Sequence, residues 1–403
     1  MEVRPIKPEE KTAFDKIQTI AFMFKRDFSK EEKEGAAPDS AQQLVNDGYK
    51  TGRAAFDDSG KMCSCFDLIP YEVVFDGNIV KMGGIGGVAS LPEERDKKYV
   101  RHIFEYVMNE MYENGYVFSY LYPFSHIYYR KFGYEHNMTV TSCSIPISSL
   151  RQFAQTGRMC MVTDDTEKKL VKTLYEEYIK DKNLAVIRTD KLWNRRFDND
   201  PYRDNVYLYI WYNSRNEARG YIQYHSERSG GIKTDFVVRE LVWLDTEALK
   251  GIFAFMGKFG SQVDKLIWKA PSYIKLLPFF EEPYDIGQEI HMSGMNRVVN
   301  VQKAFELMSL PEGKGEVVIS VEDAFFPVNT GNYRIVWNDR ERSVQKTDAG
   351  PDLACNVQAL SQLVTGFLTP DDLEFAGKVS INGKRDVLAK VFRPKRLFIN
   401  DYF

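Results

Sequence analysis

A short basic stretch, SLPEERDKKYVRHIF at residues 90–104, has the residue types of an anion-binding turn. It follows a glycine-studded apolar strand, VKMGGIGGVASL, and leads into a segment whose apolar residues recur at helical spacing. The free N–H groups at the beginning of a helix and the helix dipole attract anions. The stretch therefore predicts a site for a phosphate-bearing ligand. Lys98 stands where such a turn commonly has glycine, so a decayed turn with lysines on a solvated helix face is the alternative.

Metal and disulfide chemistry is not expected. The chain has five cysteines. Cys63 and Cys65 lie two residues apart, and we expect them on one face of a strand rather than in a zinc knuckle. An odd number without a framework spacing predicts reduced thiols of a cytoplasmic protein. No cluster of His, Cys and carboxylate residues has the spacing of a metal site, so we predict no metal.

The bulk composition describes a globular chain of several domains. The 403 residues exceed one ordinary hydrophobic core, and 43% of them are hydrophobic and 28% charged. A net charge of −3 argues against nucleic acid as a partner, because nucleic-acid binders normally carry a basic surplus. No apolar run approaches the roughly 20 residues that a membrane span needs, and the N-terminus lacks the apolar core of a signal peptide.

The pattern along the chain predicts three domains, at residues 1–150, 151–290 and 291–403. The first contains helices over 8–24 and 99–114, a hairpin at Asp76-Gly77-Asn78, and a closing strand over 138–147. The second repeats this plan more weakly. It has no basic turn between its strand at Val242 and its helix at Ala248, which predicts a repeat without the anion site. The third begins with a strand and helix near 292–308.

Two motifs together resemble the signatures of the GNAT N-acyltransferases. SLPEERDKKYVRHI is similar to their pyrophosphate loop, and SHIYYRKFGYEH to their Tyr-x-x-x-Gly-Phe/Tyr ending, here from Tyr129 to Gly133 and Tyr134. The layout of the whole chain resembles the enhanced-intracellular-survival (Eis) family of acetyltransferases, as do RVVNV at 297–301 and the final phenylalanine. The resemblance implies an α+β chain with tandem GNAT folds, the second degenerate, followed by a sterol carrier protein-like α/β domain.

The resemblance implies acetyl-CoA as the cosubstrate, bound in the first domain. Backbone groups at the end of the glycine-studded strand would hold the pantetheine arm, and the turn would hold the pyrophosphate. We expect the backbone at Lys98 to be helical already. The implied binding residues are Val88, Ala89, Ser90, Arg95, Asp96, Lys97, Lys98, Tyr99, Val100, Arg101 and Ser125.

The resemblance also implies two catalytic groups. Tyr129 lies four residues before Gly133, where the family has the acid that protonates the leaving thiolate. The terminal carboxylate, here of Phe403, would take the proton from the attacking amine. Tyr128 is the competing acid and His126 a competing base. The alternative for the apolar tail RLFINDYF is a final strand anchored in a core.

Three functions follow from these observations. The first is an acetyl-CoA-dependent N-acetyltransferase for small polyamine-like or aminoglycoside-like acceptors or lysine side chains, by direct attack on the thioester. The second is a decayed GNAT protein that binds a small molecule or lipid, motivated by Lys98 and Val100. The third is a peptidyl or aminoacyl transferase, which the C-terminal domain argues against. The resemblance implies a hexamer.

Overall fold

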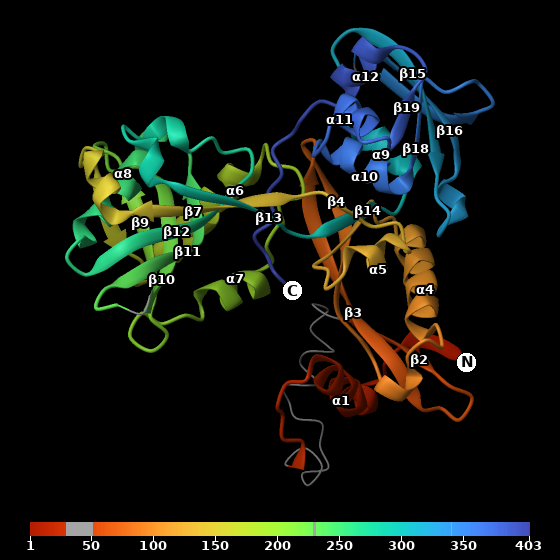
Figure 1. Ribbon diagram of the computed structural model, residues 1–403, viewed down its shortest axis with the longest axis horizontal. Helices are drawn as coiled ribbons and strands as arrows, with labels where there is room; N and C mark the ends of the chain where they lie inside the picture. Colours follow the sequence, from red (N-terminus) through yellow and green to blue (C-terminus); the bar gives the residue numbers. More distant parts are fainter. Residues whose placement is uncertain (30–50, 229–230, 340) are drawn as a thin grey trace. The chain divides into compact units, whose positions relative to one another are not determined.

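The computed structural model describes residues 1–29, 51–228, 231–339 and 341–403 (Figure 1). The chain forms two compact units that do not follow the order of the sequence. One contains Met1–Asn137, Gly294–Lys395 and Asp401–Phe403, and the other contains Met138–Ser293 and Arg396–Asn400. Most of the stretch 28–40, which the sequence predicts as a loop, lies outside the described residues.

The first unit is built on a seven-stranded sheet in the order β1-β2-β3-β4-β5-β14-β6. Strands β1 to β4 are antiparallel neighbours, whereas β4 and β5 run parallel. The strands are β1 (Glu2–Pro5), β2 (Thr51–Phe56), β3 (Met62–Phe75), β4 (Asn78–Ser90), β5 (Phe118–Leu121), β14 (Met295–Val298) and β6 (Glu135–His136).

Helices α1 (Lys11–Phe22) and α4 (Tyr99–Glu113) cover opposite faces of this sheet. A β-carbon on Gly52 would meet the ring of Phe14 in α1, while its neighbour Arg53 pairs with Glu110 of α4 at 2.8 Å. Adjacent strand residues point to opposite faces, so the two helices lie on opposite sides. The short helix α5 (His126–Arg130) follows β5.

Local patterns in this unit are as the sequence predicts. Helix α4 buries the apolar residues that recur at helical spacing, Ile103 and Val107 among them. Between β3 and β4, Asp76 and Gly77 have φ angles of 49° and 82°, the positive values that a tight hairpin turn requires.

The two GNAT-like sheets have exchanged strands. Strand β7 (Thr139–Pro146), which the sequence predicts as the last strand of the first domain, pairs with β12 and β13 in the second sheet. Strand β14, predicted to open the third domain, instead pairs with β5 and β6 in the first sheet. These two predictions are therefore wrong, because alternation identifies a strand and not its partner.

The second unit has a sheet in the order β13-β7-β12-β11-β10-β9-β8, with a core around Trp211, Phe253 and Leu266. Its strands, besides β7, are β8 (Arg158–Met161), β9 (Val206–Tyr212), β10 (Ala218–Arg228), β11 (Thr234–Trp243), β12 (Val263–Pro271) and β13 (Gly287–Met292). Its helices are α6 (Asp165–Ile179), α7 (Asp190–Phe197) and α8 (Thr246–Met256).

A third sheet, in the order β17-β16-β15-β18-β19, lies within the first unit. A fully buried ion pair between Arg297 of β14 and Asp323, 2.5 Å apart, joins this part to the first sheet. The strands are β15 (Lys314–Glu322), β16 (Gly331–Asn338), β17 (Glu341–Thr347), β18 (Leu353–Asn356) and β19 (Val379–Ile381). The helices are α9 (Val301–Leu307), α10 (Val357–Thr365), α11 (Pro370–Phe375) and α12 (Arg385–Val391).

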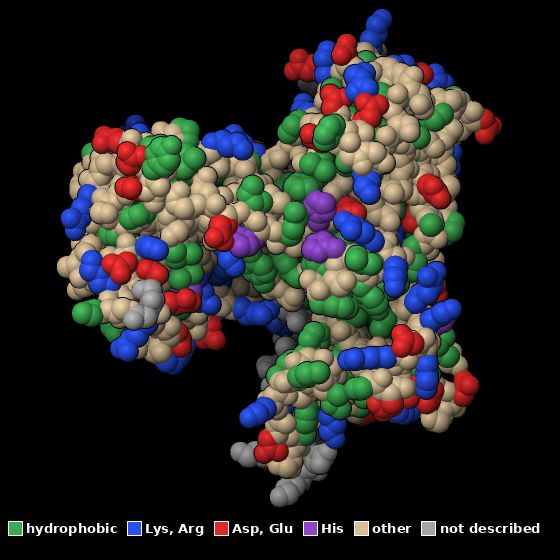
Figure 2. Space-filling model, in the orientation of Figure 1, with side chains coloured by type: hydrophobic (Ala, Val, Ile, Leu, Met, Phe, Trp, Pro, Cys, Tyr) green, Lys and Arg blue, Asp and Glu red, His purple; other side chains and the backbone are tan. Residues whose placement is uncertain are grey.

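After α12 the chain continues as a tail, residues 392–403. The tail forms one isolated β-bridge, between Leu397 and Asn183. Within the described ranges, no helix combines the length and apolar character of a membrane span. On the face shown in Figure 2, basic and acidic side chains are interspersed, in keeping with the small net charge.

Candidate active site

Strand β4 carries a β-bulge close to its end. Gly86 pairs with Asp67 and Ala89 with Cys65, so Gly87 and Val88 together oppose one residue of β3. Gly87 has a φ angle of 60°, and a β-carbon there would collide with Gln18 of α1, whose Nε2 donates to the Gly87 carbonyl at 3.1 Å. Glycine is therefore required at this bulge.

The bulge lies beyond the point where β4 and β5 separate. Their pairing ends at Ile85 and Leu121, while β4 continues to Ser90. In the described chain no strand pairs with residues 86–90 on that side. The predicted pantetheine-binding residues Val88, Ala89 and Ser90 thus form an open strand edge, with backbone groups available to an extended ligand.

The turn that follows differs from the prediction at Lys98. Lys98 is the N-cap of α4, with φ 65° and ψ 11°, so its backbone is left-handed and not helical. Asp96 also has a positive φ angle, 65°. A lysine thus adopts the conformation that glycine adopts most readily, at a cost of about 1–2 kcal/mol.

The N-terminus of α4 leaves backbone donors free. The first backbone bond of this helix runs from the His102 N–H to the Lys98 carbonyl, at 3.2 Å. Lys98 makes no side-chain cap. The N–H groups of Tyr99, Val100 and Arg101 have no hydrogen-bond partner among the described residues, as an anion cradle requires.

The charges around this turn are only partly available. Lys97 pairs with Glu94 at 2.8 Å, and Arg101 pairs with Glu105 at 2.9 Å. Both cations therefore already have carboxylate partners, and their part in phosphate binding stays a prediction. Arg95 and Lys98 form no ion pair within the described ranges and remain as the candidate phosphate-binding side chains.

Helix α5 positions the predicted acid. The Oγ atom of Ser125 accepts the Tyr128 N–H at 3.3 Å, so this side chain caps the helix. Tyr129 is 3% exposed, and its ring packs against Phe124 and Phe104 with centroid distances of 5.4 and 6.2 Å. Burial raises the pKa of Tyr129 well above 10. The phenol therefore keeps its proton at neutral and moderately alkaline pH.

The surroundings of His126 favour its neutral imidazole, and its role as the competing base stays a prediction. Its Nε2 atom is buried and has no hydrogen-bond partner among the described residues. Burial, followed by the charges of His136 and Arg130, lowers its pKa. Nearby, burial opposes ionisation of Glu135, but hydrogen bonds from His136 and Arg130 outweigh it and lower the Glu135 pKa to about 2.

The last residue, Phe403, packs against strand β4, next to the point where β4 and β5 separate. Rings of Tyr71 and Tyr122 surround the Phe403 ring, with centroid distances of 5.2 and 5.3 Å. A β-carbon on Gly84 would lie 2.9 Å from this ring, and one on Gly86 would lie 3.6 Å from the Phe403 carboxyl carbon. Gly84 and Gly86 share one face of β4, so Phe403 packs along that face and its carboxyl carbon lies at the beginning of the open edge.

Sequence reasoning missed the residues that hold Phe403 in place. Tyr71 comes from β3 and Tyr122 follows β5, and burial raises the pKa of Tyr122 far above its usual value. Neither belongs to a motif. The available signal was the GGIGG run of β4, because paired glycines in a strand indicate close approach of another group.

The corresponding helix of the second sheet has no free cradle. Asp245 caps α8 by accepting the Ala248 N–H at 2.9 Å, and its carboxylate also pairs with Arg219. A carboxylate at this position repels phosphate, which agrees with the absence of a basic turn in the sequence.

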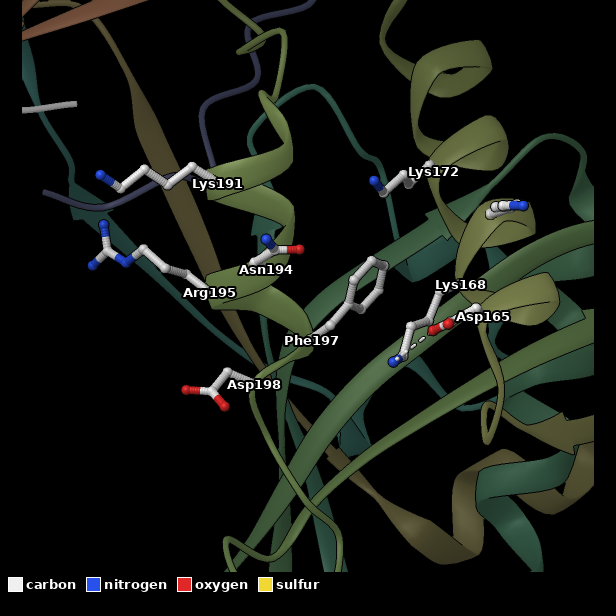
Figure 3. Close-up of a pocket in the computed structure, with 9 residues that line it drawn as sticks. Asp165, Lys168, Lys172, Lys191, Asn194, Arg195, Phe197 and Asp198 are labelled. Carbon is white, nitrogen blue, oxygen red and sulfur yellow. Dashed lines mark hydrogen bonds and ion pairs between the residues drawn. The ribbon is translucent and has the colours of Figure 1, made fainter. Parts of the chain in front are cut away.

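One pocket, of about 630 Å³, lies between α6 and α7 in the second unit (Figure 3). Its lining includes Lys168, Lys172 and Asn194 and contains none of the predicted catalytic or acetyl-CoA-binding residues. Lys168 pairs with Asp165 and Lys172 with Asp190, at 3.1 and 2.7 Å. Two of its basic side chains therefore already have acidic partners.

Comparison with known protein families identifies three domains. Residues 2–137 match an acetyltransferase (GNAT) domain, residues 184–298 a second acetyltransferase (GNAT) domain, and residues 301–399 a sterol carrier protein domain. A search of curated proteins found no match.

Solved structures share the whole fold. A probable N-acyltransferase from Enterococcus faecalis, a conserved protein of unknown function, is 22% identical with a TM-score of 0.86, and the match covers 100% of this chain and 99% of that one. A GCN5-related N-acetyltransferase from Anabaena variabilis is 21% identical with a TM-score of 0.84, and both chains are covered completely. Eis1 from Mycobacterium abscessus is 19% identical with a TM-score of 0.80, again over 100% of both chains.

These matches confirm the resemblance to Eis proteins in domain order and fold. The sheets and helices are mixed as an α+β chain requires, with two GNAT domains preceding a sterol carrier protein domain. GNAT acetyltransferases use acetyl-CoA. The chain therefore belongs to the GNAT acetyltransferases, as a member with tandem GNAT domains and a C-terminal sterol carrier protein domain.

Proposed function

We propose that this protein is an acetyl-CoA-dependent N-acetyltransferase in which the amine attacks the thioester directly. The observation that carries the proposal is the position of Phe403, whose carboxyl carbon lies against Gly86 at the open edge of β4. A general base, an open strand edge and an uncapped helix thereby belong to one domain.

The binding of acetyl-CoA is supported by the two backbone features described above. The edge formed by Val88, Ala89 and Ser90 would pair with the amides of the pantetheine arm. The N–H groups from Lys97 to Arg101 would hold the pyrophosphate, with Arg95 and Lys98 adding charge and Asp96 shaping the turn. Ser125, as the α5 cap, would set the position of the acid-bearing helix near the thioester.

Each proton has a destination in the proposed reaction. The amine nitrogen forms a bond to the thioester carbonyl carbon, and the carbon–sulfur bond breaks. The Phe403 carboxylate accepts the proton from the amine, and Tyr129 gives its phenol proton to the departing thiolate. The phenol is regenerated by exchange with solvent as CoA leaves. The Tyr129 hydroxyl has no hydrogen-bond partner in the described residues, so it is available to the sulfur.

The surroundings of Phe403 support the acceptor class that we propose. Aromatic rings of Tyr71, Tyr120 and Tyr122 pack around the Phe403 ring, and the carboxylate proposed for that residue would attract ammonium groups. Small polyamine-like molecules, aminoglycoside-like molecules and exposed lysine side chains all present such groups. We rank the small multivalent amines first, because several ammonium groups would engage both the rings and the carboxylate.

The test measures free thiol released from acetyl-CoA against a panel of polyamines, aminoglycosides and lysine peptides. Intact mass spectrometry first establishes that Phe403 ends the purified protein. One glycine added after Phe403 moves the carboxylate and should reduce kcat at least about a hundredfold, while a glycine added before Met1 serves as the control. Failure of the unmodified protein to bind CoA at millimolar concentration would contradict the proposal and favour a decayed, ligand-binding GNAT protein.

Location and assembly complete the proposal. All five cysteines are free and four are buried, which supports a reducing compartment such as the cytoplasm. The hexamer rests on the resemblance to the Eis family. Cell fractionation and light scattering coupled to size-exclusion chromatography test the two statements.

A further inference from the structure

The second GNAT domain repeats the strand geometry that marks the cosubstrate site in the first. Parallel pairing of β11 and β12 ends at Val238 and Trp268. Directly beyond, Gln223 of β10 pairs with Glu240 while Tyr224 pairs with Val238, which leaves Arg239 as an extra residue on β11. A bulge thus follows the point where β11 and β12 separate. In the same way, the bulge at Gly87 and Val88 follows the point where β4 and β5 separate.

The bulge of the second domain is occupied by the protein's own tail. The side-chain amide of Asn400 donates to the Arg239 carbonyl at 3.1 Å and to the Glu240 carboxylate at 2.8 Å. Arg196 donates to the backbone carbonyl of Asn400 at 2.9 Å. The tail therefore occupies the Arg239 carbonyl, a backbone acceptor that this strand edge would otherwise offer to an extended ligand.

Glu240 is itself fixed by buried partners. Its carboxylate accepts two hydrogen bonds from Arg188, at 2.6 and 3.0 Å, and one from the Tyr221 hydroxyl at 2.6 Å. The side chains of Glu240 and Arg188 are 1% and 0% exposed. Such a network holds its geometry, because moving any member would strand a buried charge.

The residues before Asn400 are held as firmly. The Asn183 N–H donates to the Arg396 carbonyl at 2.8 Å, and the Phe398 N–H donates to the Asn183 carbonyl at 3.1 Å. Leu397, Phe398 and Ile399 are 4%, 7% and 5% exposed. Residues 396–400 thus pack as part of the second unit, and only three residues follow.

We propose that the second GNAT domain is a clamp for the C-terminal tail, and that Asn400 is a positioning residue for the Phe403 carboxylate. This role rests on the proposed function, in which that carboxylate is the base. In the second GNAT domain, a segment of the protein's own chain would then bind at the strand bulge where a cosubstrate binds in the first domain.

Chain geometry gives the size of the effect. Three residues reach at most about 11 Å, so a fixed Asn400 confines Phe403 to a small volume. Without the clamp, the next residue toward the N-terminus that an ion pair holds is Lys395, which pairs with Asp76 at 2.6 Å, and the eight residues that follow reach about 29 Å. The accessible volume grows with the cube of this reach, roughly eighteenfold, which predicts a fall in kcat of about tenfold.

The test compares Asn400→Ala with Arg396→Ala in the full-length protein. Arg396 lies on the same tail, but its side chain is 61% exposed, pairs with an exposed Asp181 and lies 6.0 Å from the centre of the Tyr273 ring, so its loss should change little. Asn400→Ala should lower kcat about tenfold without changing KM for acetyl-CoA, and should speed hydrogen exchange in a peptide covering 396–403 about tenfold. Arg396→Ala should leave both measurements at the wild-type value.

Two results would overturn the inference. Exchange of the tail peptide at the wild-type rate in Asn400→Ala would show that the amide does not hold the tail. Faster exchange with unchanged kcat would show that the clamp does not position the base. A wild-type protein that releases no CoA with any amine would instead contradict the proposed function, and the exchange rates would still decide whether the second domain clamps the tail.

Discussion

The ring of Phe403 lies against the ring of Tyr71, with 5.2 Å between their centroids, although one residue ends the chain and the other lies in the middle of β3. A terminal residue is normally loosely held. Here the last side chain is half-buried among aromatic rings, and the glycines of β4 make room for it. The placement of the carboxylate therefore depends on the space that the glycines of β4 leave beside the sheet.

Replacing Gly84 by alanine should displace Phe403. The added β-carbon would lie 2.9 Å from the Phe403 ring and 2.8 Å from the Tyr71 ring, so both rings must shift. Overpacking of this kind costs about 1–3 kcal/mol, and we expect kcat to fall about tenfold with little change in KM for acetyl-CoA. Steady-state kinetics test this. Gly350→Ala is the matched control, because a β-carbon there meets nothing within 4 Å. Equal kcat values in both variants would contradict the packing argument.

Replacing Tyr129 by phenylalanine should lower kcat at least about a hundredfold, the smaller contribution expected of a general acid. Burial raises the pKa of Tyr129, and the active form is the protonated one. The activity of the wild type that depends on this acid should therefore persist as the pH rises to about 10. A pH profile of kcat checks both statements. Tyr128→Phe, on the same helix, should retain most activity; if it loses more than Tyr129→Phe, the roles are reversed.

Lys98 should tolerate glycine and reject a β-branched residue. Its φ of 65° is left-handed, and Lys98→Gly removes a backbone penalty of about 1–2 kcal/mol. Lys98→Val cannot adopt this conformation without strain, so the free N–H groups of α4 should lose their alignment. Calorimetric titration should show acetyl-CoA binding retained in the glycine variant and weakened about tenfold in the valine variant. Equal affinity of the two variants would mean that this backbone does not hold the phosphates.

The acid sensitivity of the protein should depend on Glu135. Its pKa is about 2 in the folded protein against 4.5 for the free side chain, because hydrogen bonds from His136 and Arg130 outweigh burial. A lowered pKa stabilises the folded state above pH 4.5, and this contribution is lost as the pH falls from about 4.5 to about 2. Glu135→Gln should therefore unfold in less urea than wild type at pH 7.

The difference between Glu135→Gln and wild type should narrow at pH 3. Urea midpoints at several pH values measure it. Glu289→Gln provides a control, since that side chain is 81% exposed. A gap that is constant with pH would show that the ionisation of Glu135 does not stabilise the fold.

Local structure was readable from the sequence, because local chemistry determines it. The spacing of Ile103 and Val107 predicts α4, and the pair Asp76-Gly77 predicts the hairpin, as observed. The motif around Tyr129 correctly indicated a GNAT domain. The roles of Tyr129, Phe403 and the cradle residues stay predictions.

Long-range structure was not readable. The alternation in β14 identifies a strand, but nothing in it names β5 as a partner. The left-handed backbone of Lys98 was missed because lysine is a poor indicator of that conformation. The bond between Asn400 and Glu240 joins residues 160 positions apart and belongs to no motif.

The strand exchange has a consequence for biosynthesis. The edge of β5 that pairs with β14 stays unpaired until β14 is synthesised, and residues 122–294 must be translated before that. At about 5–20 residues per second, the nascent chain carries an unpaired edge for roughly 10–35 seconds. Strand β14, the partner of β5, is thus synthesised only after nearly the whole of the second domain has been synthesised. Truncated products that stop before residue 294 should aggregate through the unpaired edge of β5.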